Sequence, residues 1–472
     1  MLTRSERFLF ALDRRVLGIF FRSIETVGAE NAPADGPLIV VANHANGLID
    51  PMLVLATLPV MPRFLAKSTL WGNPLLRPFL SWAKVIPVYR RQDAGVDTSK
   101  NSETFAACRR VLGEGGVVAL FPEGQSHDEP SLTPIKTGTA RIALETEMEH
   151  GAVGVRILPI GLTFDAKDRF RSRVLVTVGE PFSARQAAGP EAPATGEGIG
   201  DGAPPAAVRA LTDAIDAALE SVTLNHDTWD EARLVRRAAE IHTRDDLDLP
   251  TRGRLAEGAE VERAFAAGYR TLQASHPQAV ARVAEAVRLY DRLLATAGLR
   301  DRHVAARYHP ARVAGFAGRS LATLLVRLPL AVVGGLANVV PFHLTRIVAD
   351  LIARERDQFA SWKVFPALAL YPLTWIAEAS VAGWWVGREA GAWAGWAVAL
   401  LVLLLAPLTG WVALRFRDHA SRLVLEARAF LVLRRRKRFA EELRAERQDV
   451  RRRVEELVEL WREGEGDESG QE

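Results

Sequence analysis

Residues 37–58 read PLIVVANHANGLIDPMLVLATL. The apolar run PLIVVAN is typical of a buried strand, and PMLVLATL has the composition of a helix. Turn-forming residues lie between the two runs. A strand, a loop and a helix in this order predict one unit of a largely buried α/β sheet. Because ligand groups in such domains lie at the strand ends, the connecting loop is the first candidate site.

This loop carries His44 and Asp50, with five residues between them. On a regular helix that spacing would separate the two side chains, but a turn at Asn46-Gly47 lets them meet. A histidine held by a carboxylate can take a proton from an alcohol. In the alternative interpretation, Asp50 precedes Pro51 only as the N-cap of the next helix, and His44 is an ordinary loop histidine.

Strand and helix patterns alternate over residues 25–186, which predicts an α/β domain. The further strand patterns are RFLAKS, VIPVYRR, GVVALFPEG, RILPIGLTF and RVLVTVGEP, and the further helix patterns are ETFAACRRVL and TGTARIALETEM.

The N-terminal segment of residues 1–24 has apolar residues at helical spacing, interrupted by arginines, so it is not a typical signal peptide. We expect it to form an amphipathic helix at a membrane interface. Packing of this helix on the α/β domain is the alternative. The apolar residues are Phe8, Leu12, Val16, Ile19 and Phe20.

The second half of the chain changes in composition. Residues 187–207 are rich in Ala, Gly and Pro and predict a flexible linker, and the charged helical patterns of residues 208–310 predict a helical subdomain. Residues 415–472 predict a basic juxtamembrane helix followed by an acidic tail.

Residues 311–414 form the predicted membrane region. Segments 364–386 and 392–414 are long enough to cross ~30 Å of hydrocarbon and predict a transmembrane hairpin. Segment 321–342 contains Arg327, two prolines and two glycines, which favours a re-entrant or interfacial segment. Basic residues flank the hairpin on both sides, so both flanks should be cytoplasmic and the number of spans even. A soluble helical core is the alternative.

Composition narrows the partners and the chemistry. The chain has 472 residues, a formal net charge of +3 and one cysteine, Cys108, which excludes a disulfide framework and a cysteine-rich metal site. We expect Cys108 to be an ordinary packed residue. The basic residues concentrate at both ends of the chain, which suggests an anionic membrane surface. Nucleic acid is not expected, because no recognition motif accompanies the basic runs.

Three further segments carry polar residues at predicted strand ends. Arg90 and Arg91 end VIPVYRR, and an arginine fork matches a phosphate. Glu123 and Gly124 follow GVVAL, which places a carboxylate where the backbone can approach a polar substrate closely. The dipeptide His127-Asp128 is a second acid/base pair or, alternatively, part of a hydrogen-bonded loop.

The four motifs NHANGLIDP, VIPVYRR, FPEGQSHDEP and LPIGLTF resemble, in order and spacing, the four blocks of the glycerolipid acyltransferase superfamily. The common pattern has four residues between histidine and aspartate and a Thr-Arg-Ser after FPEG. The longer spacing and the FPEGQSHD form resemble the fungal-type glycerol-3-phosphate/dihydroxyacetone-phosphate acyltransferases. The segment VTLNHDTWDEARLVRRAAEIH and the late apolar hairpin also resemble that branch.

The resemblance implies that His44 is a general base for a glycerol hydroxyl and that Asp50 orients its ring. The hydroxyl would attack the thioester of acyl-CoA or acyl carrier protein directly, so no cofactor or metal is expected. The remaining residues would bind substrate. Arg90 and Arg91 would hold the acceptor phosphate, Glu123, Gly124 and Ser126 would line the acceptor site, Lys67 and Lys136 are further phosphate candidates, and Pro159 would shape an acyl pocket unless it is plain strand packing.

The predicted function is a membrane-bound transferase that acylates the sn-1 hydroxyl of glycerol 3-phosphate, with dihydroxyacetone phosphate as a further acceptor. Its catalytic domain should lie on the cytoplasmic face of a bacterial inner membrane, in contact with membrane lipids. One alternative is sn-2 acylation of lysophosphatidic acid. Others are a non-catalytic lipid-binding membrane protein and a metal-dependent hydrolase that uses His44, Asp50, His127 and Asp128.

Overall fold

The computed structural model describes residues 2–72, 77–89, 98–167, 169–192, 202–244, 254–306, 308, 310–352 and 359–468. The chain divides into two compact units. Unit 1 comprises residues 1–225 with 353–361, and unit 2 comprises residues 226–352 with 362–472.

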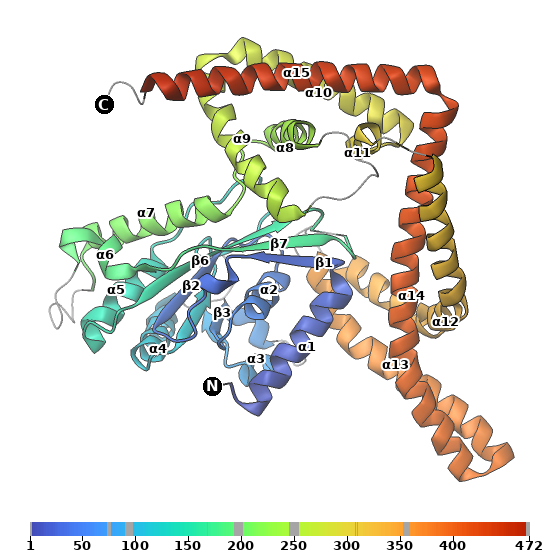
Figure 1. The fold of residues 1–472 in the computed structure, drawn as a ribbon. Coiled ribbons are helices and arrows are strands. Elements are labelled where there is room, and N and C mark those ends of the chain that lie inside the picture. The colour runs from blue at the N-terminus through green and yellow to red at the C-terminus, as the bar shows by residue number, and fades with distance from the viewer. Residues whose placement is uncertain are drawn as a thin grey trace. The chain divides into compact units, whose positions relative to one another are not determined.

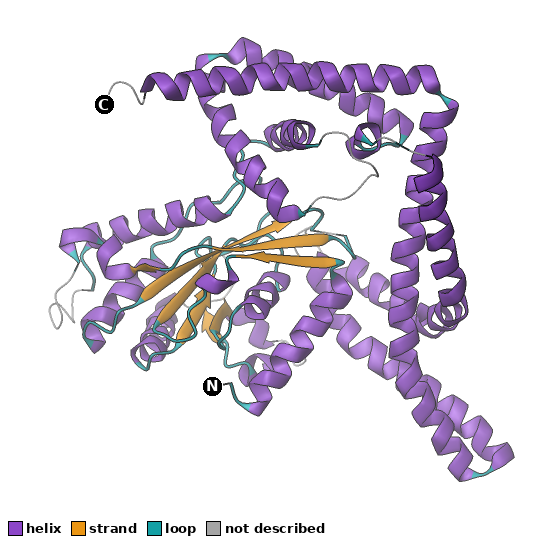
Figure 2. Cartoon of the chain, in the orientation of Figure 1, coloured by secondary structure: helices purple, strands orange, loops and turns teal. Residues whose placement is uncertain are grey.

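Unit 1 is built around one eight-stranded sheet, drawn in orange in Figure 2, with the order β1-β7-β6-β2-β5-β3-β4 and β8 paired to β6. Two pairs of neighbouring strands, β6 with β7 and β6 with β8, are antiparallel. All other neighbouring strands, including β2 and β6, are parallel. The expected α/β class and its predicted strands are therefore confirmed. The strands are β1 (Ser23–Val27), β2 (Leu38–Ala42), β3 (Arg63–Lys67), β4 (Ile86–Val88), β5 (Val117–Leu120), β6 (Arg156–Phe164), β7 (Arg173–Val178) and β8 (Phe182–Ser183).

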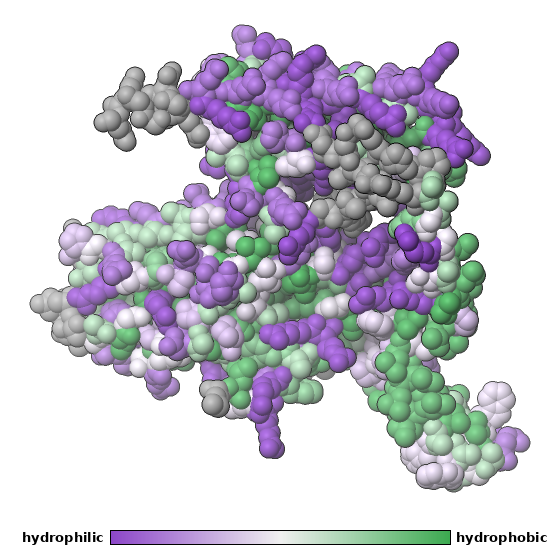
Figure 3. All heavy atoms as spheres, in the orientation of Figure 1, coloured by the Kyte–Doolittle hydropathy of each residue, from purple (hydrophilic) through white to green (hydrophobic). Residues whose placement is uncertain are grey.

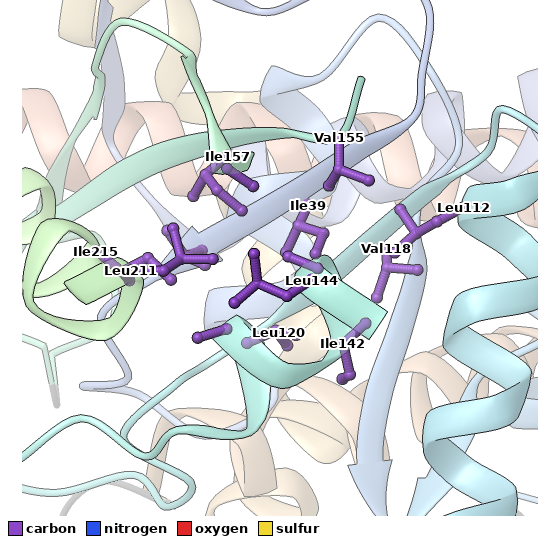
Figure 4. Close-up of a cluster of buried hydrophobic side chains, with 14 of the residues drawn as sticks. Ile39, Leu112, Val118, Leu120, Ile142, Leu144, Val155, Ile157, Leu211 and Ile215 are labelled. Atoms are coloured by element: carbon purple, nitrogen blue, oxygen red, sulfur yellow. The ribbon is translucent and has the colours of Figure 1, made fainter. Parts of the chain in front are cut away.

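Helices cover both faces of this sheet, and all five residues of β2 are therefore buried. Figure 4 shows a hydrophobic cluster on one face of the sheet, in which Ile39, Val118 and Ile157 from the strands meet Leu144 and Leu211 from the covering helices. The helices of unit 1 are α1 (Arg4–Phe20), α2 (Ile49–Thr57), α3 (Arg77–Trp82), α4 (Asn101–Gly113), α5 (Gly138–His150), α6 (Ala184–Ala187) and α7 (Pro205–Val222), with short 3₁₀ helices at Ala29–Asn31, Ser68–Gly72, Thr98–Lys100 and Gly189–Glu191.

Helix α7 differs from its predicted place in a separate helical subdomain. It packs on β6 within unit 1. A Cβ atom at Gly161 of β6 would lie 1.9 Å from the carbonyl oxygen of Val222, so glycine is required for this close approach. The expected linker, residues 187–207, includes the 3₁₀ turn Gly189–Glu191 and the start of α7, while residues 193–201 lie outside the described part of the chain.

Unit 2 is helical and contains three helices, α12, α13 and α14, that are long and apolar enough to cross a membrane. Apolar side chains cover much of their surface in Figure 3. Residues 321–342, for which the sequence predicts a re-entrant or interfacial segment, lie within one continuous helix, α12. The helices, labelled in Figure 1, are α8 (Trp229–Thr243), α9 (Leu255–Ser275), α10 (Pro277–Ala297), α11 (Asp301–Ala305), α12 (Pro310–Ile352), α13 (Phe359–Ala390), α14 (Ala392–Arg435) and α15 (Lys437–Glu468).

Close backbone contacts join the three apolar helices. A Cβ atom at Gly395 would lie 2.5 Å from the carbonyl oxygen of Gly383, so α13 and α14 touch through small residues. Asn338 of α12 donates from Nδ2 to the Ala406 carbonyl of α14 at 3.2 Å. Its Oδ1 accepts the indole N–H of Trp375 at 3.0 Å, which satisfies a polar group among apolar helices.

Segments before α12 and after α14 build one common hydrophobic core. Tyr290 of α10 and Arg447 of α15 both donate to Asp301 of α11, at 2.9 and 2.8 Å. Arg302 donates to Glu426 of α14 at 2.7 Å. The apolar members of this core are Ala238, Ile241, Val283, Ala286, Val287, Tyr290, Leu294, Leu299, Val304, Ala429, Leu433, Ala440, Leu443, Val450 and Val454.

This shared core restricts the membrane topology. Two segments that pack into one core would lie on the same side of a bilayer, so we expect an even number of the three apolar helices to cross it. Basic residues flank the α13–α14 hairpin on both sides, and the positive-inside rule places both flanks in the cytoplasm. This arrangement also requires an even number of spans. Crossing by α13 and α14, the predicted hairpin, would satisfy both constraints.

We therefore expect cysteines at Glu285→Cys of α10 and Glu441→Cys of α15 to be labelled by an impermeant maleimide from one side of the membrane. A cysteine at Glu389→Cys, at the end of α13, should be labelled from the other side. Cys108 is fully buried, so it gives a low background. Labelling of positions 285 and 441 from opposite sides would contradict the shared core.

Candidate active site

Two neighbouring parallel strands bring the candidate residues together. Val41 of β2 pairs with Leu120 of β5, so the loops after both strands leave the same edge of the sheet. The first loop carries His44 and the second carries Glu123. The backbone N–H of His127 donates to the His44 carbonyl at 3.1 Å, which ties the two loops to each other.

His44 and Asp50 meet as predicted. His44 Nδ1 lies 2.9 Å from Asp50 Oδ2, which also accepts the backbone N–H of Asn46 at 2.7 Å. Because an ionised carboxylate can only accept hydrogen bonds, we assign the proton between the two groups to Nδ1 of His44. Nε2 of the neutral imidazole then carries no proton and keeps a free lone pair. The Asp50 side chain is fully buried, whereas that of His44 is 18% exposed. The imidazole therefore has one nitrogen fixed by the protein and an edge within reach of a substrate.

The local turn departs from the capping prediction. Gly47 has φ +45°, and Ile49 N–H donates to the Asn46 carbonyl at 3.0 Å, so the expected turn is present. Helix α2 begins at Ile49, however, and its N-cap is Leu48. The expectation that Asp50 is the N-cap is therefore wrong. Asp50 lies in the first turn of α2, and its carboxylate points back toward the loop.

An aromatic ring fixes the plane of the imidazole. The ring of Phe121 stacks on His44 with centroids 4.2 Å apart and an interplanar angle of 17°. Because Phe121 immediately follows β5, the sheet itself positions this ring. Together with the bond to Asp50, the stacking limits rotation of the His44 side chain.

The carboxylate of Glu123 is directed into the protein. Its Oε1 accepts the backbone N–H of His44 at 2.6 Å, and its Oε2 accepts from the His127 ring and from the N–H and hydroxyl of Thr133, at 2.9 and 3.0 Å. Burial would raise the pKa of Glu123, but these hydrogen bonds outweigh it and hold the pKa below its usual range. Glu123 thus positions the His44 loop, which differs from its expected role as a ligand of substrate hydroxyls.

His127 and Asp128 do not form an acid/base pair. The backbone N–H of Glu129 donates to His127 Nδ1 at 3.2 Å, so Nε2 carries the proton that His127 donates to Glu123. Asp128 instead forms an ion pair with Lys167 at 2.6 Å. These contacts support the alternative interpretation, in which His127 and Asp128 belong to a hydrogen-bonded loop. The residues that a metal-dependent hydrolase would use as metal ligands are bonded to different protein partners instead.

Lys167 is a site residue that sequence reasoning missed. Its ammonium donates to the carbonyls of Ala45 and His127, both at 3.1 Å, besides pairing with Asp128. Its own carbonyl accepts the side-chain N–H of Asn46 at 3.1 Å. An ammonium has three donors, and these three acceptors use them, so Lys167 joins the two loops. No local pattern marks it, because its partners lie far away in the sequence.

The expected phosphate ligands lie along the same edge of the sheet as far as the structure describes them. Lys67 ends β3 and pairs with Val88, the last residue of β4. Arg90 and Arg91, which follow β4 in the sequence, lie outside the described residues. Lys136 is exposed and lies over Gly124, where a Cβ atom would come 2.3 Å from its ammonium nitrogen. Ser126 is half-buried in the loop between Glu123 and His127.

Pro159 lies inside the sheet. It is buried in β6, paired with Val41 of β2, and its carbonyl accepts the N–H of Gly179 at 2.9 Å. A Cβ atom at Gly179 would lie 2.8 Å from Pro159 Cγ, so the proline ring packs closely there. These contacts favour strand packing over a role in an acyl pocket.

Comparison with known families matches both halves of the chain. The Acyltransferase family matches residues 23–163, which contain the His44 loop and the sheet from β1 to β6, but not β7 and β8. The family described as Glycerol-3-phosphate acyltransferase 2 C-terminal domain matches residues 249–462, which lie in unit 2 except for residues 353–361.

Individual relatives agree with these matches. An uncharacterized acyltransferase of Schizosaccharomyces pombe is 26% identical over 86% of this chain and 73% of its own length. Glycerol-3-phosphate O-acyltransferase 2 of Saccharomyces cerevisiae is 29% identical over 58% of this chain, and the match spans only 37% of that enzyme. A 1-acyl-sn-glycerol-3-phosphate acyltransferase of Borreliella burgdorferi is 28% identical over 33% of this chain and 57% of its own length.

The family matches define the chain as an acyltransferase enzyme of glycerolipid synthesis, and the His44–Asp50 pair lies in the matched region. It belongs to the glycerolipid acyltransferase superfamily, and the match of its second half relates it to the fungal-type glycerol-3-phosphate acyltransferases.

We expect Lys167→Met to lower kcat by roughly 10- to 100-fold, because a small displacement of the His44 loop is enough for such a loss. KM should change by less than about twofold, since the ammonium of Lys167 has no donor left for substrate. Steady-state kinetics on the detergent-solubilised enzyme measures both parameters.

The matched control is Asp128→Asn, which leaves both carbonyl partners of Lys167 in place and should have the smaller effect. A large rise in KM with unchanged kcat in Lys167→Met would contradict a positioning role and indicate substrate binding.

Proposed function

We propose that the protein is a membrane-bound O-acyltransferase that moves a fatty acyl group from acyl-CoA or acyl carrier protein to the sn-1 hydroxyl of glycerol 3-phosphate. Dihydroxyacetone phosphate, which carries a comparable hydroxyl and phosphate, is a further acceptor. The main support is the His44–Asp50 pair in the region that matches the Acyltransferase family, combined with the C-terminal family match.

The proposed reaction uses His44 Nε2 as a general base. As the acceptor oxygen attacks the thioester carbonyl, its proton moves to Nε2, and Asp50 stabilises the imidazolium through Nδ1–H. The C–S bond of the resulting tetrahedral adduct then breaks, and the departing thiolate takes the proton from His44. The products are an ester and a free thiol, and no covalent acyl-enzyme is needed.

The acceptor phosphate would lie among basic residues at the ends of β3 and β4. Lys67 lies at this edge, and the chain continues from β4 toward Arg90 and Arg91. We assign these three residues and Lys136 to phosphate binding, because a dianionic phosphate is best held by several donors with positive charge. Gly124 and Ser126 would line the same acceptor site.

The location follows from the substrates. The product is an amphiphile that enters a bilayer, while thioester donors are cytosolic. We therefore assign the catalytic unit to the cytoplasmic face of a bacterial inner membrane. The basic residues flanking the apolar hairpin support this orientation.

We expect His44→Ala to lower kcat by roughly 10²- to 10⁴-fold, the usual contribution of a general base. Asp50→Asn should also lose at least about 100-fold, because an amide at this position favours the wrong tautomer of His44. Circular dichroism and membrane insertion serve as controls for folding. Wild-type activity in His44→Ala would refute the general-base assignment.

A second candidate acceptor is lysophosphatidic acid, acylated at its sn-2 hydroxyl, which the similarity to the Borreliella burgdorferi enzyme favours. Incubation of the purified enzyme with labelled acyl-CoA and each acceptor in turn separates the two functions. We expect turnover with glycerol 3-phosphate and a monoacylated product. Turnover with lysophosphatidic acid alone would replace the proposed function by the second candidate.

A further inference from the structure

Strand β2 leaves the sheet at Asn43, whose carboxamide takes over the pairing of the backbone. Ala42 is the last residue of β2 that pairs with β6, opposite Ile160. Beyond this pair, Asn43 Nδ2 donates to the carbonyl of Leu162 at 3.1 Å, and Asn43 Oδ1 accepts the Leu162 backbone N–H at 2.7 Å. A carboxamide offers one kind of donor and one acceptor, so it replaces a peptide group here. The backbone of His44 can therefore turn away from β6 toward the loop after β5, which binds its N–H and its carbonyl.

A second asparagine fastens the turn of the same loop. Asn46 is fully buried, and its Nδ2 donates to the backbone carbonyl of Lys167 at 3.1 Å. The carbonyl of Asn46 accepts the N–H of Ile49 at 3.0 Å, which closes the turn in which Gly47 has φ +45°. Asn46 thus joins the turn before α2 to the loop between β6 and β7.

The backbone N–H of Asn46 extends this series of contacts to the His44–Asp50 pair. It donates to Asp50 Oδ2 at 2.7 Å, and the same oxygen lies 2.9 Å from His44 Nδ1. The carboxamide of Asn46 therefore fixes the N–H that holds Asp50, and Asp50 in turn orients the imidazole. A shift of this turn would displace the carboxylate from His44 although neither side chain had changed.

The loop between β6 and β7 supports this contact because both of its ends are tied to regular elements of unit 1. At its start, the N–H of Asp165 donates to the carbonyl of Arg173 in β7 at 3.1 Å, and Asp165 Oδ1 accepts the Arg173 N–H at 3.0 Å. Near its end, Arg171 donates to the carbonyls of Ile19 and Phe21 at the end of α1, at 3.1 and 2.7 Å. The Asn46 carboxamide thus links the His44 loop to a segment that is itself held in place.

We propose that Asn46 is a positioning residue for acyl transfer, which sets the place of Asp50 beside His44, and that Asn43 assists it by releasing the loop from β6. Because Asn46 is fully buried, it acts through Asp50 and not by contact with a substrate. The role rests on the proposed function of His44 as the general base. A purely structural role of the carboxamide would predict a loss of stability alone, whereas this series of contacts predicts a loss of turnover.

The variant Asn46→Ala removes the carboxamide and keeps the backbone N–H, so the turn loses its support. We expect kcat to fall roughly 10- to 100-fold, because a small misplacement is enough for such a loss, and KM to stay within about twofold. Asn46→Asp fills the same space and should lose at least as much, because a carboxylate oxygen would then face the Lys167 carbonyl. Steady-state kinetics of the full-length enzyme in detergent, with labelled acyl-CoA and glycerol 3-phosphate, measures both parameters.

The matched control is Asn31→Ala. Asn31 Nδ2 donates to the backbone carbonyl of Val178, also at 3.1 Å, and neither residue belongs to the His44 loop or the Glu123 loop. Both alanine variants lose one hydrogen bond of the same kind, so their melting temperatures should fall by similar amounts, whereas kcat should fall only in Asn46→Ala. Equal kcat values in the two variants, or a large rise in KM in Asn46→Ala, would overturn the positioning role.

Hydrogen exchange distinguishes this proposal from the assignment of the general base. Deuterium uptake by the peptide that spans residues 43–50 should be faster in Asn46→Ala than in the wild type, and unchanged in Asn31→Ala. This measurement needs no turnover, so it tests the contact even if His44→Ala proves to be active. Unchanged uptake would overturn the proposal, as would faster uptake with wild-type kcat. If Asn46→Ala does not fold, the isosteric variant Asn46→Asp decides by the same two measurements.

Discussion

The buried carboxylate of Glu123 is the constraint on which the geometry of the candidate active site depends. Its two oxygens accept hydrogen bonds from the His44 backbone, the His127 ring and Thr133. These donors offset the cost of burying the charge and lower the pKa of Glu123, and they come from both loops, so they hold the loops after β2 and β5 in one arrangement. The orientation of the His44 imidazole follows from that arrangement, and Asp50 and Phe121 then fix the ring itself.

Lys167 repeats the same principle with opposite charge. Glu123 accepts hydrogen bonds from donors around His44. The ammonium of Lys167 in turn donates to the carbonyls of Ala45 and His127. Glu123 is buried and Lys167 is half-buried, and loss of one partner from a charged group in such a position costs more than an ordinary hydrogen bond. Two charged side chains of opposite sign therefore hold the loops of the candidate active site in place.

Much of this architecture could be predicted from the sequence, because strands and helices are encoded by local periodicity. The run at 37–58 gave β2, the turn at Asn46-Gly47 and the meeting of His44 with Asp50. The N-cap is Leu48 and not Asp50, because the helix begins two residues earlier than predicted, without a side-chain cap. Lys167 and the inward orientation of Glu123 could not be predicted, because both depend on contacts between loops that are distant in the sequence and close only in the folded sheet.

The shared core of unit 2 has a consequence for the biosynthesis of the chain. Helices α8 and α10 leave the ribosome long before Leu433 and Leu443, which complete their core. The apolar helices of the predicted membrane region are synthesised between these two parts of the core. Folding of the helical unit therefore waits for insertion, and a chain that stalls or inserts wrongly exposes half of an apolar core. Chaperones and proteases recognise exposed apolar surfaces of this kind. A chain that inserts incorrectly is therefore expected to be degraded, because its core stays incomplete.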